Sequence, residues 1–138
     1  MADLAAPTRC KVIRIDQMEP AVAAAAAVVA GAIVGIDANG RVELAIANGA
    51  AGADEPLAGI VVSVDGHGAN GAVTVLKKGL VDCGNVFDTL AYGAPVYLSG
   101  ATAGRMNDAA ATQVVKIGRV WPIWNNTSQP DKGLYIDV

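Results

Sequence analysis

Residues 33–46 read IVGIDANGRVELAI, two β-prone runs on either side of a polar turn. Ile33-Val34-Gly35-Ile36 forms the first run, and Arg41-Val42-Glu43-Leu44-Ala45-Ile46 forms the second. The turn Asp37-Ala38-Asn39-Gly40 contains Asn-Gly, a strong short-range hairpin signal because both residues tolerate a positive φ angle. The stretch therefore predicts two antiparallel strands joined by a tight turn.

Further β-prone runs follow at intervals of about ten residues, separated by glycine-rich turn signals. A small-residue loop is expected at 48–55 and a glycine-rich turn at 65–71. Strands are expected at residues 57–64, 72–81, 96–98, 114–120 and 134–138. Many short strands with turns between them are typical of a small barrel or sandwich. We therefore expect a mostly β fold.

One pattern occurs twice along the chain. Each copy has a glycine before an apolar strand, a Gly-Arg pair that closes a turn, and a later apolar strand centred on glycine. The first copy comprises Gly31-Ala32-Ile33-Val34, Gly40-Arg41 and residues 57–61, and the second comprises Gly93-Ala94-Pro95-Val96, Gly104-Arg105 and residues 116–120. A glycine within a strand allows another backbone to approach closely. The pattern predicts an internal repeat of hairpin units.

The chain divides into an N-terminal arm at 1–20, a β domain at 21–124 and a C-terminal tail at 125–138. In the arm, basic and apolar residues alternate imperfectly as in a strand, and Glu19-Pro20 is expected to end it. Residues 125–132 are polar and turn-rich, so the strand at 134–138 is expected to be detached. It pairs either with its own sheet or with the edge of a neighbour.

Residues 21–30 are ambiguous between helix and strand. Their alanines favour a helix by propensity. Against a helix, the run has no polar face and leads directly into the strand that follows Gly31. We expect strand or extended chain.

Composition bounds the class of protein. The 138 residues fit one domain, and 53% are hydrophobic, mostly Ala and Val, with only 4% aromatic. The net charge of −3 argues against binding to a phosphate backbone, which needs clustered Lys and Arg. The N-terminus lacks the basic start and apolar run of a signal peptide. The apolar residues 21–36 are too few for a membrane span, so synthesis in the cytoplasm is expected.

Reactive groups are few and scattered. Cys10 and Cys83 form no CxxC pair, and free cysteines are commonly small buried hydrophobic residues. His67 is the only histidine and lies in the turn Asp65-Gly66-His67-Gly68, where a solvated position is expected. The carboxylates form neither a paired-carboxylate site nor a calcium loop. We therefore expect no catalytic, cofactor-binding or metal-binding residue, and no cofactor.

Trp121 and Trp124 concentrate much of the aromatic area in Val120-Trp121-Pro122-Ile123-Trp124. One interpretation is a plug in the core or a cap over an open barrel end. The other is a subunit or partner interface, where Trp is enriched.

Several stretches together resemble the small head decoration, or capsid cement, proteins of tailed phages. The matching stretches are VAGAIV (29–34), GRV (40–42), EPLAGIV (55–61), GAVTVLKKG (71–79), LAYGAPVYL (90–98), AGRM (103–106) and VKIGRV (115–120). The resemblance implies a compact, β-tulip-like domain, commonly trimeric, with an N-terminal arm that lies on the outer surface of the capsid. The Trp pair and the tail after Asn125 depart from that pattern.

The expected function is therefore that of a structural virion protein that stabilises the shell from outside. Its expected partners are the major capsid protein and further copies of itself in a homotrimer, with neither nucleic acid nor membrane. The residues expected at the capsid or subunit interface are Arg9, Lys11, Val12, Ile13, Arg14, Ile15, Trp121 and Trp124. Removing residues 1–16 is expected to leave the β domain folded and to weaken attachment to the shell.

Two alternatives belong to other classes of protein. A carbohydrate- or ligand-binding β module would carry both tryptophans exposed in a groove, where they stack on sugar rings. An enzyme would use His67 as a base and would need a concave pocket around it.

Overall fold

The computed structural model describes residues 3–24, 28–47, 56–64, 70–111, 113–126 and 128–138. Within these ranges it contains nine strands and no helix. The strands are β1 (Lys11–Val22), β2 (Ile33–Ile36), β3 (Val42–Leu44), β4 (Leu57–Val64), β5 (Ala72–Asp82), β6 (Pro95–Leu98), β7 (Met106–Asn107), β8 (Lys116–Pro122) and β9 (Lys132–Asp137). The prediction of a mostly β fold is confirmed.

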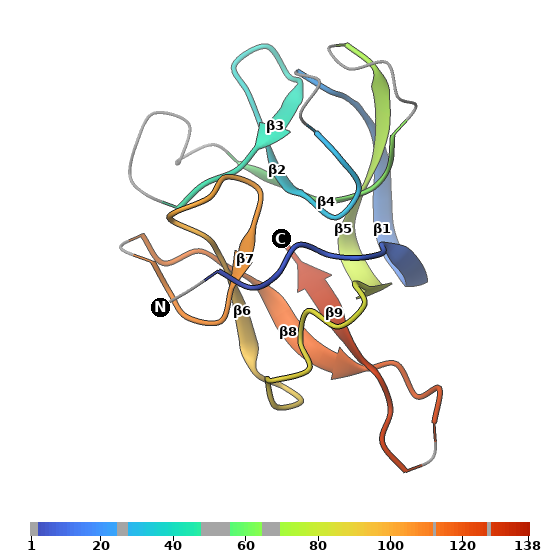
Figure 1. Ribbon diagram of the computed structural model, residues 1–138. Helices are drawn as coiled ribbons and strands as arrows, with labels where there is room; N and C mark the ends of the chain where they lie inside the picture. The colour runs from blue at the N-terminus through green and yellow to red at the C-terminus, as the bar shows by residue number, and fades with distance from the viewer. Residues whose placement is uncertain (1–2, 25–27, 48–55, 65–69, 112, 127) are drawn as a thin grey trace.

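The strands form one antiparallel sheet in the order β3-β2-β4-β5-β9-β8-β6-β7, with β1 added on β5. Figure 1 shows the sheet curling on itself into a half-barrel. β5 pairs with β4 through its first half and with β9 through its second half. In the part of the chain that the structure describes, no helix is long and apolar enough to cross a membrane.

Two apolar clusters hold the sheet together. The larger cluster draws on both halves of the chain and surrounds Phe87, the only phenylalanine, which is fully buried. The smaller cluster lies beside β2, β4 and β5 and is completed by Ala23 and Val28. Ile33 belongs to the larger cluster and Val34 to the smaller, because successive side chains of a strand point to opposite faces.

The structure confirms the internal repeat. β2 pairs with β3 and β4, and β6 pairs with β7 and β8. Val34 is opposite Gly59 and Val96 is opposite Gly118, with a bulge following each of these pairs. Hydrogen bonds match as well: Gly31 N donates to Val61 O, and Gly93 N donates to Val120 O, both at 2.7 Å. Each copy is therefore the same arrangement of three strands.

The repeat extends to the strand that follows each unit, so that β5 corresponds to β9. Ile60 pairs with Leu76 in the first copy, and Arg119 pairs with Tyr135 in the second. On this correspondence Lys78 matches Asp137, and these two residues are opposite each other where β5 meets β9. If the two repeats are exchanged, Lys78 takes the place of Asp137 and Asp137 that of Lys78, so the pair is the same. A local two-fold relationship between the repeats requires this.

The hairpin at 33–46 forms as predicted, but its turn differs in detail. Gly40 has a φ of +78°, whereas Asn39 is absent from the described residues with positive φ. Asp37 stabilises the turn instead, because its carboxylate accepts hydrogen bonds from the backbone N–H groups of Asn39 and Arg41. These hydrogen bonds lower the pKa of Asp37, the bond from Arg41 most of all. The turn therefore needs only one residue with positive φ.

The N-terminal segment is more closely integrated than the sequence indicated. β1 continues through Pro20 to Val22, so the expectation that Glu19-Pro20 ends the strand is wrong. Proline is tolerated where its missing N–H removes no essential ladder bond. Before β1, Leu4 is buried in the larger cluster, and its N–H donates to Met106 O. The described part of 21–30 contains strand and no helix, as expected.

The C-terminal strand pairs with its own sheet and is not detached from it. β9 lies between β5 and β8, and Leu134 and Ile136 are fully buried. Both the predicted arm and the predicted tail therefore contribute a strand to the sheet. The loop at 48–55 and residues 65–69 of the glycine-rich turn, His67 included, lie outside the described residues.

Candidate functional site

The predicted interface residues of the arm lie on or just before β1, which is exposed along most of its length. Ile15 is 54% exposed, and Ile13, Met18 and Val22 are exposed as well. Val12 is the exception, because it is half-buried against the larger cluster. The strand therefore presents apolar side chains to solvent while hydrogen bonds hold its backbone to β5.

The basic residues of this segment have different surroundings. Arg9 forms an ion pair with Asp82 at 2.9 Å. Lys11 is exposed at the start of β1, opposite Asp82. Arg14 pairs with Asp16 at 3.2 Å, and its guanidinium lies 5.1 Å from the centre of the Tyr135 ring. Of these three basic residues, Arg14 is thus the one that contacts Tyr135 on β9.

Tyr135 connects β1 to the predicted tryptophans. Its ring lies 6.2 Å from that of Trp121, centre to centre, and its hydroxyl donates a hydrogen bond of 2.9 Å to Asp16. That hydrogen bond is the main cause of the lowered pKa of Asp16, to which Arg14 also contributes. Arg14 and Trp121 are therefore far apart in the sequence, but both lie against the ring of Tyr135.

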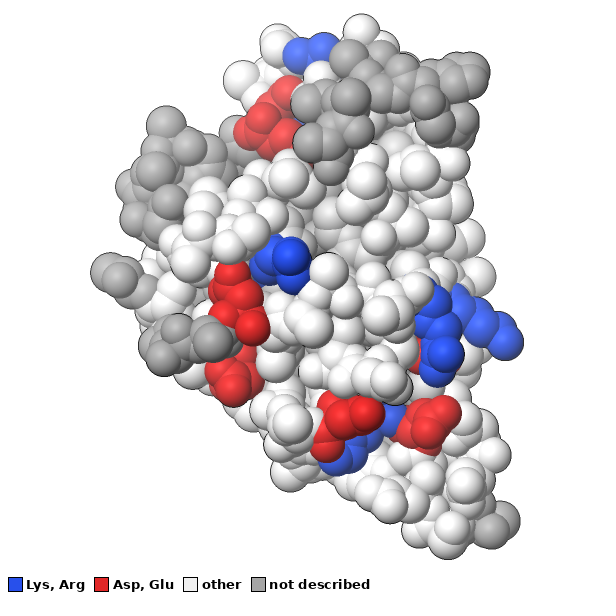
Figure 2. Space-filling model, in the orientation of Figure 1, with Lys and Arg blue, Asp and Glu red and all other residues white. Residues whose placement is uncertain are grey.

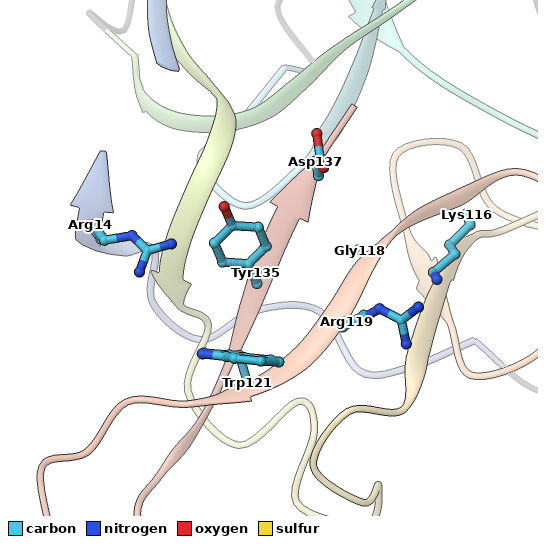
Figure 3. A pocket seen from close by; sticks show the side chains of 7 residues that line it. All are labelled: Arg14, Lys116, Gly118, Arg119, Trp121, Tyr135 and Asp137. Atoms are coloured by element: carbon cyan, nitrogen blue, oxygen red, sulfur yellow. The ribbon is translucent and has the colours of Figure 1, made fainter. Parts of the chain in front are cut away.

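These residues border a groove of about 580 Å³ on the surface of β8 and β9. The groove is lined by Arg14, Lys116, Gly118, Arg119, Trp121, Tyr135 and Asp137. Figure 3 shows Arg14, Tyr135 and Trp121 following one another on one side, with Lys116 and Arg119 on the other. The site combines two aromatic rings, three cations and one carboxylate.

The two tryptophans form an exposed pair. Trp121 is 36% exposed and Trp124 is 68% exposed, so the interpretation as a core plug is wrong. Their rings are nearly perpendicular, with centres 6.4 Å apart. Trp124 borders a second hollow of about 740 Å³ together with Asn125, Asn126 and Pro130. The pair therefore joins two neighbouring recesses of the surface.

Charge in the groove is unevenly compensated. Asp137 lies 4.0 Å from Lys78, and Arg14 is paired with Asp16. Lys116 and Arg119 form no ion pair with any residue that the structure describes. Arg119 donates one hydrogen bond of 3.3 Å to the carbonyl oxygen of Gly93. Two exposed cations on β8 are therefore free to meet an anion.

Chemically reactive groups do not converge anywhere in the described ranges. Cys83 is fully buried, and Cys10 is half-buried with its thiol donating to Val61 O at 3.3 Å. Burial raises the pKa of both thiols, that of Cys10 to about 11. Among the described residues, no three His, Cys, Asp or Glu side chains lie close enough to hold a metal ion.

Lys116, Arg119, Tyr135 and Asp137 were not anticipated from the sequence as site residues. Strand alternation around Val120 was the available signal, because Val120 on β8 packs in the core. It identifies Arg119 and Trp121 as outward-facing, but it cannot tell which strand lies alongside. The register Arg119 opposite Tyr135 depends on the pairing of β8 with β9.

Neither a protein-family model, nor a curated protein, nor a solved structure matches this chain.

Charged side chains are mixed in sign over the face of the molecule that Figure 2 shows. Figure 2 shows acidic and basic side chains interspersed over a mostly uncharged face, without a continuous basic area. That face lacks the clustered positive charge that binding to nucleic acid requires.

Proposed function

We propose that this protein is a structural, non-enzymatic component of a phage virion that binds the outer surface of the capsid and stabilises the shell. The resemblance of residues 29–120 to decoration proteins gives the class of partner, the major capsid protein. The observation that carries the proposal is β1, a twelve-residue strand with exposed apolar side chains. The four exposed apolar side chains of this strand support contact with another protein, since exposed apolar surface commonly marks interaction sites.

The proposal also assigns a trimer as the working form. An interface of ordinary specificity buries about 1,200–2,000 Å² in total. A chain of 13.9 kDa offers only a modest contact by itself, and linking three copies multiplies attachment through effective concentration. Closed symmetry also covers exposed strand edges without producing filaments.

Binding to emptied, expanded phage heads that lack their decoration protein tests the proposal. Co-sedimentation at a fixed ratio of chains to capsid subunits is expected, together with a higher melting temperature of the heads. Light scattering of the free protein at high concentration should give the mass of a trimer, or the copies bound to the shell should be arranged as trimers. Protein that stays in the supernatant at all concentrations would refute the function.

A second candidate is a carbohydrate-binding module, and the exposure of Trp121 and Trp124 is the observation that favours it. Exposed aromatic rings beside a groove are able to stack on sugar rings. This candidate expects quenching or enhancement of tryptophan fluorescence by soluble glycans, with loss of the response in Trp124→Ala. No response to a panel of neutral and acidic glycans would exclude it.

A further inference from the structure

We propose that the groove on the surface of β8 and β9 is the docking site for an acidic segment of a protein partner. The inference rests on the proposed function in one respect: the partner is taken to be the capsid protein. It assigns the contact to the groove-lining residues Arg14, Lys116, Arg119, Trp121 and Tyr135.

The charges of the groove indicate that the partner is negatively charged. Lys116 and Arg119 lie on β8 without an ion pair among the described residues, while Asp137 is already near Lys78. The local excess of positive charge contrasts with a net charge of −3 for the chain. Charged groups at an interface are arranged to complement those of the partner, so a partner with carboxylates fits this site.

The aromatic side of the groove is preorganised. Tyr135 is fixed by its hydrogen bond to Asp16, by Arg14 over its ring, and by contact with Trp121. Preorganised groups lose little conformational entropy on binding. Trp, Tyr and Arg are also the residue types most enriched among those that dominate binding energy in protein interfaces. The composition therefore favours a protein segment as the occupant.

Comparison of the two repeats shows that this surface is specific to the second copy. The cross-strand pair Ile60–Leu76 is fully buried in the first copy, and the corresponding pair in the second is Arg119–Tyr135. The same arrangement of strands thus holds a buried pair in the first copy and a pair that lines the groove in the second. The two polar residues are not required by the strand pairing itself, which supports a role in binding.

The arrangement of the rings favours a peptide over a sugar. Trp121 meets Trp124 at 86° and Tyr135 at 55°, and Tyr135 has a guanidinium over its ring. A sugar ring stacks best on an open, flat aromatic face, but Arg14 lies over the ring of Tyr135 and Trp121 is only 36% exposed. An extended acidic segment instead places carboxylates on Lys116 and Arg119 and an apolar side chain against the aromatic residues.

The test uses the full chain and a short synthetic peptide of glutamate, aspartate and leucine. Titration should change the tryptophan fluorescence, and the affinity should fall with added salt. The double variant Lys116→Glu/Arg119→Glu should bind at least about tenfold more weakly, because two attractive contacts become repulsive. Asp137→Asn should bind more tightly. Lys77→Glu is the control, since it reverses one charge on β5 at a residue that does not line the groove.

Three results would overturn the inference: no response to the acidic peptide, equal affinity of the double variant, or tighter binding of polygalacturonate than of the peptide. Thermal melting of each variant establishes that it is folded. Sedimentation with phage heads separates the two proposals. If the wild type and the double variant bind heads equally, the groove assignment fails and the function stands. If the wild type binds the peptide and not the heads, the capsid function fails and the groove stands.

Discussion

Gly118 is the residue at which sequence and packing are most tightly connected. A Cβ atom placed there would lie 2.1 Å from the carbonyl oxygen of Tyr135, and one at Gly59 would lie 2.2 Å from that of Leu76. These are equivalent positions of the two repeats. At both, the neighbouring strand approaches so closely that only glycine fits.

Gly118→Ala is expected to lower the free energy of unfolding by about 3 kcal/mol, because a methyl group would have to displace the backbone of β9. Gly93→Ala is the control: its φ is +83°, but nothing lies within 4 Å of the added Cβ. It should cost about 1 kcal/mol from backbone strain alone. Urea denaturation measures both values, and equal losses would show that β9 moves away readily.

The two thiols are expected to be slow to react in the folded protein. Burial raises the pKa of Cys10 to about 11 from an ordinary value of 9.0, so little thiolate exists at pH 8. Iodoacetamide should label Cys10 slowly at pH 8, with a rate that rises about tenfold per pH unit towards pH 11. The contribution of Cys10 to the free energy of unfolding should be constant below pH 9 and should decline between pH 9 and 11. The reason is that the Cys10 thiol ionises at a lower pH in the unfolded chain than in the folded protein. Urea-unfolded protein, in which both thiols react quickly, is the control, and rapid labelling of native protein at pH 8 would contradict the prediction.

At the scale of elements, β1 is both paired with the sheet and exposed to solvent. It is held by ten residue pairs with β5, yet nearly all its side chains are exposed. Several bulges interrupt its register. Bulges and charged residues discourage uncontrolled pairing of an exposed strand with other chains. β1 is thus attached through its backbone, while its side chains remain available.

Deleting residues 1–16 is now expected to destabilise the domain, in contrast to the expectation from the sequence. The deletion removes buried Leu4 and leaves the backbone groups of β5 opposite Lys11 to Ile15 without partners. Thermal unfolding should show a clearly lower melting temperature or no cooperative transition. The double variant Ile13→Ser/Ile15→Ser is the control, because it retains the strand and should melt near the wild type. A truncated protein as stable as the full chain would show that residues 1–16 add nothing to the stability of the fold.

At the scale of the whole molecule, two copies of one three-strand unit share a core. Phe87, in the segment between β5 and β6, is buried in the cluster that both copies line. The sheet is continuous through the pairing of β5 with β9. The larger apolar cluster draws on both copies, so we expect the two to fold together.

Cutting the chain between the exposed residues Asp88 and Thr89 tests this cooperativity. Each fragment alone is expected to be unfolded, because Leu134 and Ile136 in one half and Leu76 in the other would lose their shared core. Mixing the fragments should restore the β-sheet signal in circular dichroism and dispersed NMR spectra. A dispersed spectrum from either fragment alone would show that one unit is an independent domain.

Local patterns were sufficient for much of the fold. The hairpin at Asn39-Gly40, the strand at Leu57–Val64 and the equivalence of Gly59 with Gly118 all follow from residues near one another in sequence. Turn chemistry, alternation and close approach act over a few residues, so a single sequence carries that information. Arg14, Trp121 and Trp124 were also identified as surface candidates from their chemistry alone.

Pairing between distant strands determines the features of the fold and of the groove that the sequence did not predict. That β9 lies between β5 and β8, that Leu4 enters the core and that Arg14 reaches Tyr135 all depend on contacts between distant segments. The same outward alternation of β8 and β9 is compatible with many neighbours, and only the three-dimensional register brings Arg119 opposite Tyr135. The groove therefore arises from strand pairing, because no short stretch of sequence contains both of its sides.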